Sequence, residues 1–130
     1  MHRVPVAMAA ADPSAGLHKL IEIFCEFWSF DREAMTRLHG AGANDDELGE
    51  SIRARNERRR RALSVLVNRM VERNEIRAEA RRDLIDTLFA LTSLHFFAEL
   101  AAAGRSAKAA GALVQAAAAD AIRRASTQTS

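Results

Sequence analysis

Arginine side chains form the densest group of chemically capable residues in this sequence. Six lie between positions 53 and 61, at Arg53, Arg55, Arg58, Arg59, Arg60 and Arg61. Such a run could neutralise nucleic-acid phosphates. On a helix, however, these residues spread around the whole circumference, no aromatic residue interleaves them, and the formal net charge is only +2. We therefore favour a solvated helix face, preceded by balancing acids, over a nucleic-acid patch.

Two of these arginines, Arg55 and Arg59, interrupt an apolar line. At about 100° per residue they share one helix face with Leu48, Ile52, Leu63, Leu66 and Met70. Either the middle of this helix leaves the core, or two arginine heads point inward. An inward arginine needs a carboxylate or an anionic ligand as its partner. A purely structural role for Arg55 and Arg59 is the more common case, and contact of these arginines with an anionic ligand stays open as the alternative.

Two histidines and a set of aromatic residues allow the same two interpretations. His39 and His95 fall on apolar faces, where a histidine usually satisfies one hydrogen bond but can also contact a ligand. The aromatic residues are typical of a core, yet an organic ligand's pocket is also mostly apolar with a few polar groups. The ligand-binding candidates are Phe24, Phe27, Trp28, Met35, His39, Arg55, Arg59, Leu66, Met70, Phe89, Thr92 and His95.

Motifs for catalysis are missing. The sequence holds no phosphate-binding loop, no dinucleotide fingerprint, no HExxH and no paired-cysteine metal site. Neither His39 nor His95 has a glutamate three residues before it, as helical di-metal sites require. The lone Cys25 is interpreted as a small buried apolar residue in a reducing compartment rather than as a catalytic thiol. We expect no enzymatic activity, no cofactor and no metal.

Five helices are expected to position these residues. The 130-residue chain is rich in alanine, arginine, leucine and glutamate, and has no proline after Pro13, which predicts an all-α protein. Asp12-Pro13 opens a helix over about 13–29, and a short helix follows over 31–41. Asn44 and Glu47 resemble a capping box for a helix that runs to about 73, with Asn74 as its stop. Further helices are expected over 78–103, ended by Gly104, and from Ser106 to about 125. No apolar run approaches the roughly 20 residues of a membrane span, so we expect a cytoplasmic protein without membrane contact.

The last two helices suggest a second copy of the chain. Between Leu84 and Leu100 only Asp86 and Glu99 are charged, so that helix needs cover on both sides. The final helix carries small residues along one broad side, which allows close helix approach. We predict an antiparallel bundle of about five helices that dimerises through its last two helices as a four-helix bundle. Candidate interface residues are Phe89, Phe96, Leu100, Ala107, Gly111, Val114, Ala118, Ala121 and Ile122. An alanine-rich helix packed within one chain is the alternative.

This order of elements resembles the C-terminal, ligand-binding and dimerisation domain of TetR-family transcriptional regulators. The resemblance is carried by the segments 12–17 (DPSAGL), 26–28 (EFW), 53–60 (RARNERRR), 66–70 (LVNRM), 91–93 (LTS) and 104–106 (GRS). It covers about residues 10–125 and implies an effector-binding and dimerisation domain over 12–125, with 126–130 as a flexible tail. In that family the last two long helices form the dimer bundle, and the preceding helices enclose a pocket for a small, often apolar effector.

One part of the family's pattern is absent. The N-terminal helix-turn-helix of three helices has no room here, and residues 1–11 are expected to be a residual linker helix or disordered. DNA contact is therefore expected only through a module absent from this chain. The leading hypothesis is an effector-binding domain of a TetR-like repressor, sensing a small hydrophobic ligand. A purely structural dimerisation module without a ligand is the main alternative.

Overall fold

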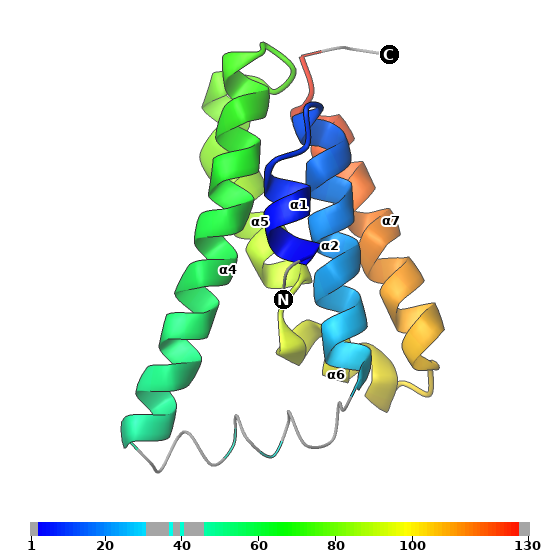
Figure 1. Cartoon of the computed structure of the whole chain (residues 1–130). Coiled ribbons are helices and arrows are strands. Elements are labelled where there is room, and N and C mark those ends of the chain that lie inside the picture. The colour runs from blue at the N-terminus through cyan, green and yellow to red at the C-terminus, as the bar shows by residue number, and fades with distance from the viewer. Residues whose placement is uncertain (1–2, 31–36, 38–39, 41–45, 128–130) are drawn as a thin grey trace.

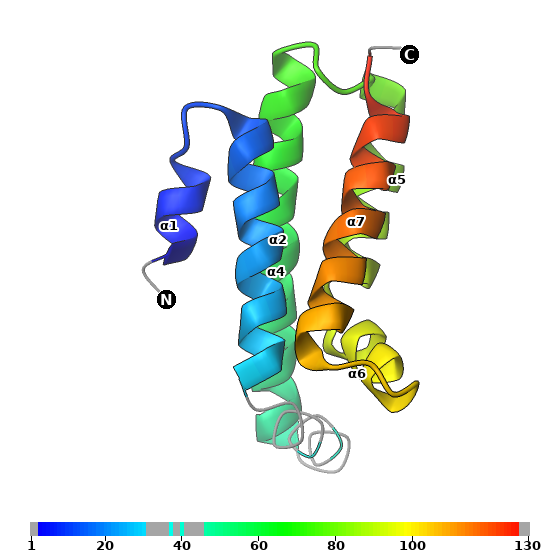
Figure 2. The same cartoon turned by 90° about the vertical axis from the view of Figure 1, so that its right-hand side faces the viewer.

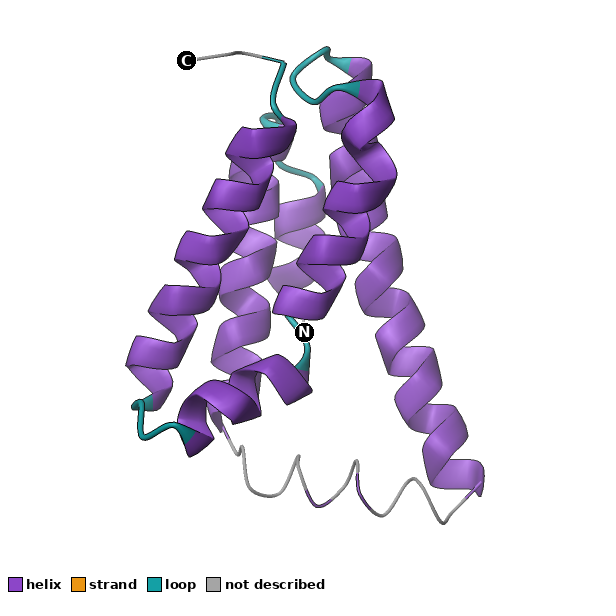
Figure 3. Cartoon of the chain, turned by 180° about the vertical axis from the view of Figure 1, so that it is seen from behind, coloured by secondary structure: helices purple, strands orange, loops and turns teal. Residues whose placement is uncertain are grey.

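The structure is a computed structural model that describes residues 3–30, 37, 40 and 46–127. Its helices are α1 (Arg3–Met8), α2 (Pro13–Phe30), α4 (Asp46–Glu72), α5 (Arg81–Leu91), α6 (Leu94–Ala102) and α7 (Ala107–Ala125), with a short 3-10 turn at Ala78–Ala80 (Figure 1). The described residues contain no strand (Figure 3). The all-α prediction is confirmed. The helix expected over 31–41 falls almost entirely outside the described residues.

Several predicted helix ends are confirmed by their local geometry. The backbone N–H of Ser14 donates to Asp12 Oδ1 at 3.1 Å, directly before α2 continues. After α4, Asn74 adopts a φ of 60°, a left-handed conformation that ends a helix. Gly104 adopts a φ of 95° after α6, and Ser106 accepts a hydrogen bond from Ala109 N at the start of α7.

The prediction of one continuous helix over 78–103 is wrong. Thr92 and Ser93 divide it into α5 and α6, which are bent by 50° relative to each other. Ser93 has extended backbone angles, and its hydroxyl accepts from Phe96 N at 3.1 Å, so it acts as the N-cap of a new helix. Among the described residues no single helix could cross a membrane; only this bent pair has the necessary length and composition when its two halves are taken together.

The helices form three layers, seen best from the side (Figure 2). The short α1 lies outermost, α2 and α4 form the middle layer, and α5 and α7 form the third, with α6 crossing at one end. The hydrophobic core lies between the second and third layers. Its fully buried side chains include Leu17, Leu20, Leu63, Leu66, Leu88 and Val114.

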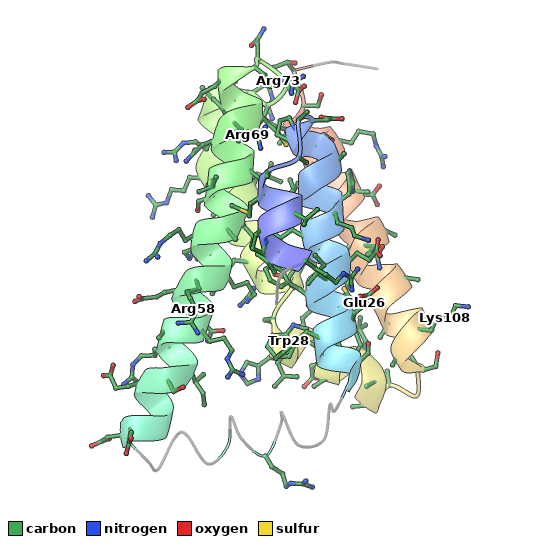
Figure 4. All side chains as sticks on the ribbon, in the orientation of Figure 1. Glu26, Trp28, Arg58, Arg69, Arg73 and Lys108 are labelled. Atoms are coloured by element: carbon green, nitrogen blue, oxygen red, sulfur yellow. The ribbon has the colours of Figure 1, made fainter. Side chains whose placement is uncertain are left out.

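Arg69 of α4 and Arg73, which directly follows α4, hold the turn between α1 and α2 (Figure 4). Arg69 donates to Met8 O at 3.0 Å and to Ala10 O at 2.8 Å, and Arg73 donates to Ala11 O at 2.9 Å. These cations neutralise the carbonyls at the C-terminal end of α1. Gly16 lets α1 approach α2 closely, since a Cβ there would lie 2.5 Å from Ala7 O.

The small-residue face of α7 is covered by its own chain. Gly111, Val114, Ala118 and Ile122 are buried, and a Cβ on Gly111 would lie 3.6 Å from Cys25 Cβ on α2. These four predicted interface positions are therefore corrected to intrachain packing positions, because α2 supplies the close partner helix. Phe89, Phe96, Leu100, Ala107 and Ala121 remain partly exposed.

The expected flexible tail is also partly wrong, because Ser126 and Thr127 are held by the turn after α4. Thr127 N donates to Glu75 O at 3.1 Å and Thr127 Oγ1 to Asn74 O at 2.8 Å. Arg77 N donates to Ala125 O at 3.0 Å, and Ile76 forms an isolated antiparallel bridge with Ser126. The end of α7 is thereby fixed to the α4–α5 connection.

Candidate functional site: a cationic pocket between α2 and α4

A pocket of about 380 Å³ lies between α2 and α4, with α1 contributing to one wall. We call it the α2–α4 pocket. Its apolar lining consists of Val4, Phe24, Phe27, Trp28 and Ala62, and its polar lining of Arg55, Asn56, Arg58 and Arg59. No described residue that lines it is acidic. The surface is thus apolar and aromatic on the α2 side and cationic on the α4 side.

Helical spacing explains how each helix presents these groups. Phe24, Phe27 and Trp28 follow an i, i+3, i+4 pattern, which places them on one face of α2. Arg55, Arg59 and Ala62 follow an i, i+4, i+7 pattern along α4. The rings of Phe27 and Trp28 meet edge to face, with centroids 5.0 Å apart. In Figure 4, Arg58 on α4 and Trp28 on α2 lie at the same level of the molecule.

Arg59 is the only charged side chain that is buried in the described part of the chain, with 7% of its surface exposed. Its Nη1 donates to Phe89 O at 2.6 Å and to Thr92 Oγ1 at 2.7 Å. The guanidinium carbon lies 3.9 Å from the centroid of the Phe89 ring, a cation–π contact. Its Nε is buried and has no hydrogen-bond partner. The side chain of Arg59 therefore points inward, which is one of the two arrangements that the helical spacing allowed.

The charge of Arg59 has no carboxylate partner among the described residues. Burial, with a smaller contribution from neighbouring Arg60, lowers the pKa of Arg59 to about 10. By contrast Arg53 pairs with Glu50 at 2.9 Å and Arg60 with Asp86 at 2.7 Å, and neither lines the pocket. Arg59 remains a cation at neutral pH, in a place where only neutral acceptors meet it.

Thr92 connects the pocket walls to the break between α5 and α6. Trp28 Nε1 donates to Thr92 O at 2.8 Å, while Thr92 Oγ1 accepts from Arg59 and donates to Leu88 O at 2.7 Å. Thr92 is 1% exposed. One residue at the end of α5 thus receives a hydrogen bond from each wall of the α2–α4 pocket.

The structure brings together part of the predicted ligand set. Phe24, Phe27, Trp28, Arg55 and Arg59 line the α2–α4 pocket, and Phe89 and Thr92 contact the Arg59 guanidinium. Leu66 is a core residue with no exposed surface, and Met70 is buried beside a separate surface hollow. Met35 and His39 lie outside the described residues.

His95 is exposed, so its predicted place on an apolar face is wrong. The prediction extended the period of α5 through the break at Thr92-Ser93, beyond which the helix has a new direction. Sequence reasoning also missed Val4, Asn56, Arg58 and Ala62 as lining residues. The i+3 and i+7 positions from Arg55 could have indicated Arg58 and Ala62; nothing in the sequence indicates Val4, whose position depends on how α1 packs.

Cys25 does not have the environment of a nucleophile. It is 5% exposed, and its Sγ lies 4.0 Å from Gly111 O at the α2–α7 contact. Burial, followed by the charges of Glu26 and Glu22, raises the pKa of the Cys25 thiol to about 11. The thiol is therefore protonated at neutral pH. Within the described ranges, no group of three or more His, Cys, Asp or Glu side chains could hold a metal ion.

Comparisons with known proteins add no relative to this description. No protein-family model, no curated protein and no solved structure matches the chain, so the resemblance to TetR-family domains rests on the sequence pattern alone.

Proposed function

We propose that this chain is a small-molecule-binding module that takes a largely apolar ligand into the α2–α4 pocket, as the effector-binding domain of a TetR-like repressor does. The observation that carries the proposal is a pocket with three aromatic side chains on one wall and a buried arginine without a carboxylate partner on the other. A packed structural core would not combine these features.

The dimensions of the pocket support a small organic ligand. A volume of about 380 Å³ lies near the lower end of the range for ligand sites, which are mostly apolar with a few polar groups. Phe24, Phe27 and Trp28 supply flat apolar surface, and burying a ligand against them removes apolar area from water. The ligand therefore has room for one or two rings or a branched alkyl group.

The hydrogen bonds of Thr92 support a sensing role. A ligand that contacts Trp28 and Arg59 touches both donors that hold Thr92, at the point where α5 ends and α6 begins. A ligand can shift a conformational equilibrium only through different affinities for its states. Different positions of Trp28 and Arg59 relative to Thr92 would supply that difference, and a DNA-binding module outside this chain would report it.

Protein NMR with a fragment library tests the binding proposal. Trp28 is the only tryptophan, so its indole N–H gives one resolved signal from inside the pocket. We expect apolar fragments to shift this signal in a saturable way. Ala62→Phe should abolish the shift because Ala62 is a partly exposed lining residue, so the larger ring fills the pocket. Ala54→Phe, at an exposed position of the same helix outside the lining, is the matched control.

Two results would contradict the binding proposal. Either no fragment of the library moves the Trp28 signal, or Ala62→Phe binds the same fragments with unchanged affinity. The first result would favour the alternative, a structural module without a ligand. The second would place the binding site elsewhere on the chain.

The antiparallel arrangement and the dimer belong to the same proposal. In Figure 1 the chain descends along α2 and α5 and ascends along α4 and α7, which supports an antiparallel bundle. Because the small-residue face of α7 is already covered, the dimer would use the outer faces of α6 and α7. There Leu113 is 37% exposed, and Phe96 and Leu100 are partly exposed. Light scattering at micromolar concentration should give a mass of two chains, and Leu113→Glu should reduce the measured mass to that of one chain.

A further inference from the structure

The charge distribution around the α2–α4 pocket defines its ligand more closely than shape does. Arg55, Arg58 and Arg59 all line it, and none of the three forms an ion pair with a described residue. Three nearby carboxylates are paired elsewhere, namely Glu50 with Arg53, Asp86 with Arg60, and Glu26 with Arg3. Glu57 of α4 is exposed and does not line the pocket. Positive charge at the pocket is therefore left without a counter-charge, although acids lie on the same helices.

Arg59 is the central group in this distribution. Both of its hydrogen bonds are donated by Nη1, to the neutral acceptors Phe89 O and Thr92 Oγ1. Nη2 donates to no described residue, and the buried Nε has no partner. A buried cation is normally paired, and a buried unsatisfied donor in a native protein calls for an explanation such as an absent ligand. An anionic group in the pocket would pair the charge and accept a hydrogen bond from Nη2, whereas Nε has almost no surface exposed to the pocket.

The alternative is that Arg59 serves only to cap α5. A cation at the C-terminal end of a helix is favourable, and Phe89 O and Thr92 lie at that end. Capping accounts for Nη1 and leaves Nη2 without a described partner. It also gives no reason for Arg55 and Arg58 to line the same apolar space, with Arg55 lying 5.9 Å from the centroid of the Phe27 ring.

We propose that the α2–α4 pocket selects amphipathic monoanions, namely molecules with a compact aromatic or branched apolar body and a single carboxylate. This inference rests on the proposed binding function and names its ligand class. The carboxylate lies against Arg59, and the body lies against Phe24 and Phe27. One carboxylate matches the single buried cation. Arg55 and Arg58, which are more exposed than Arg59, attract the anion on its approach.

A matched pair of probes tests this selectivity. 2-Naphthoate and 2-naphthamide share one apolar body and differ in charge, and binding of each can be measured by calorimetry and by the Trp28 indole signal. We expect 2-naphthoate to bind at least tenfold more tightly than 2-naphthamide at pH 7 and low salt. Arg59→Met should lower the affinity for 2-naphthoate much more than that for 2-naphthamide, so that the tenfold preference is lost.

Arg61→Met is the matched control, since it removes an equal charge from an exposed position of α4 outside the α2–α4 pocket and should reduce naphthoate binding less than twofold. Equal binding of the two probes, or equal loss in Arg59→Met and Arg61→Met, overturns the monoanion inference while the binding proposal stands. Absence of binding by both probes and by every fragment of the library overturns the binding proposal itself. Circular dichroism of Arg59→Met establishes that it folds, and the comparison of the two probes on the unmodified chain does not depend on that variant.

Discussion

Replacing Arg59 by methionine should leave the stability of the folded chain almost unchanged, although Arg59 is buried and hydrogen bonded. Methionine keeps the apolar stem and contact with the Phe89 ring, and it removes the buried charge. Two effects then oppose each other. The relief from burying a charge stabilises the variant, and the loss of two hydrogen bonds from Nη1 destabilises it.

Both effects can be sized from the structure. The fall of the Arg59 pKa from its ordinary value to about 10 corresponds to about 3 kcal/mol against the charged form at neutral pH. Each lost bond to a neutral acceptor removes about 1.5 kcal/mol, the lower end for a charged donor. The two losses together amount to about 3 kcal/mol, so the net change in the free energy of unfolding should be within about 1 kcal/mol of zero.

Urea unfolding followed by circular dichroism at pH 7 measures this change. Arg60→Met serves as the control, because it removes a half-exposed ion pair with Asp86 that contributes about 0–1 kcal/mol. A loss of 3 kcal/mol or more in Arg59→Met would refute the reasoning, since it would mean that the hydrogen bonds outweigh the buried charge and that Arg59 is retained for stability. A near-neutral result means that stability alone does not explain a charge at this position.

Three further predictions concern the packing of the helices. Gly16→Ala should destabilise the chain by about 1–3 kcal/mol, because the new Cβ would lie 2.5 Å from Ala7 O. Gly111→Ala, whose Cβ would have its nearest contact at 3.6 Å, should stabilise the chain by up to about 1 kcal/mol. Equal effects of the two substitutions in thermal unfolding would contradict the packing described. Because the pKa of Cys25 is raised to about 11, the thiol ionises first in the unfolded chain. The free energy of unfolding should therefore be constant below about pH 9 and fall by about 2 kcal/mol as the pH rises toward 11. Urea unfolding of Cys25→Ala over the same pH range should lack this part of the fall, and identical pH profiles of the two chains would contradict the prediction. Ser93→Ala should lower the free energy of unfolding by about 1 kcal/mol through the lost N-cap of α6, while an unchanged value would show that tertiary packing alone fixes the break.

The sequence was most informative where local chemistry decides the structure. Residues at helix termini act through their own backbone angles and nearest neighbours, so their roles were predictable from the sequence. Asp12 and Ser106 begin helices, and Asn74 and Gly104 end them. Ser93 has the same local chemistry, but a long apolar pattern on both sides concealed it. A continuous hydrophobic period does not by itself show that a helix is continuous.

The pocket was predictable only in part because it depends on which helix faces are paired. Periodicity showed that Arg55 and Arg59 share a face with apolar residues, and that face does border the α2–α4 pocket. Periodicity could not show that α2 would cover the small residues of α7, since an apolar face carries no label for its partner. The place of Val4 depends on the contact of α1 at Gly16, which becomes evident only in three dimensions.

The outermost helix gives the pocket a wall with a stability of its own. Among the six residues of α1 only Ala7 is buried, and the helix is held by the exposed Arg3–Glu26 ion pair and by the bonds of Arg69 and Arg73 to the turn that follows it. Segments with so little buried area open locally at a lower free energy than the whole fold requires. Detachment of α1 would therefore remove Val4 from the wall of the α2–α4 pocket without unfolding of the core. Salt, which screens the exposed Arg3–Glu26 ion pair, would favour this local opening without an equal loss of overall stability.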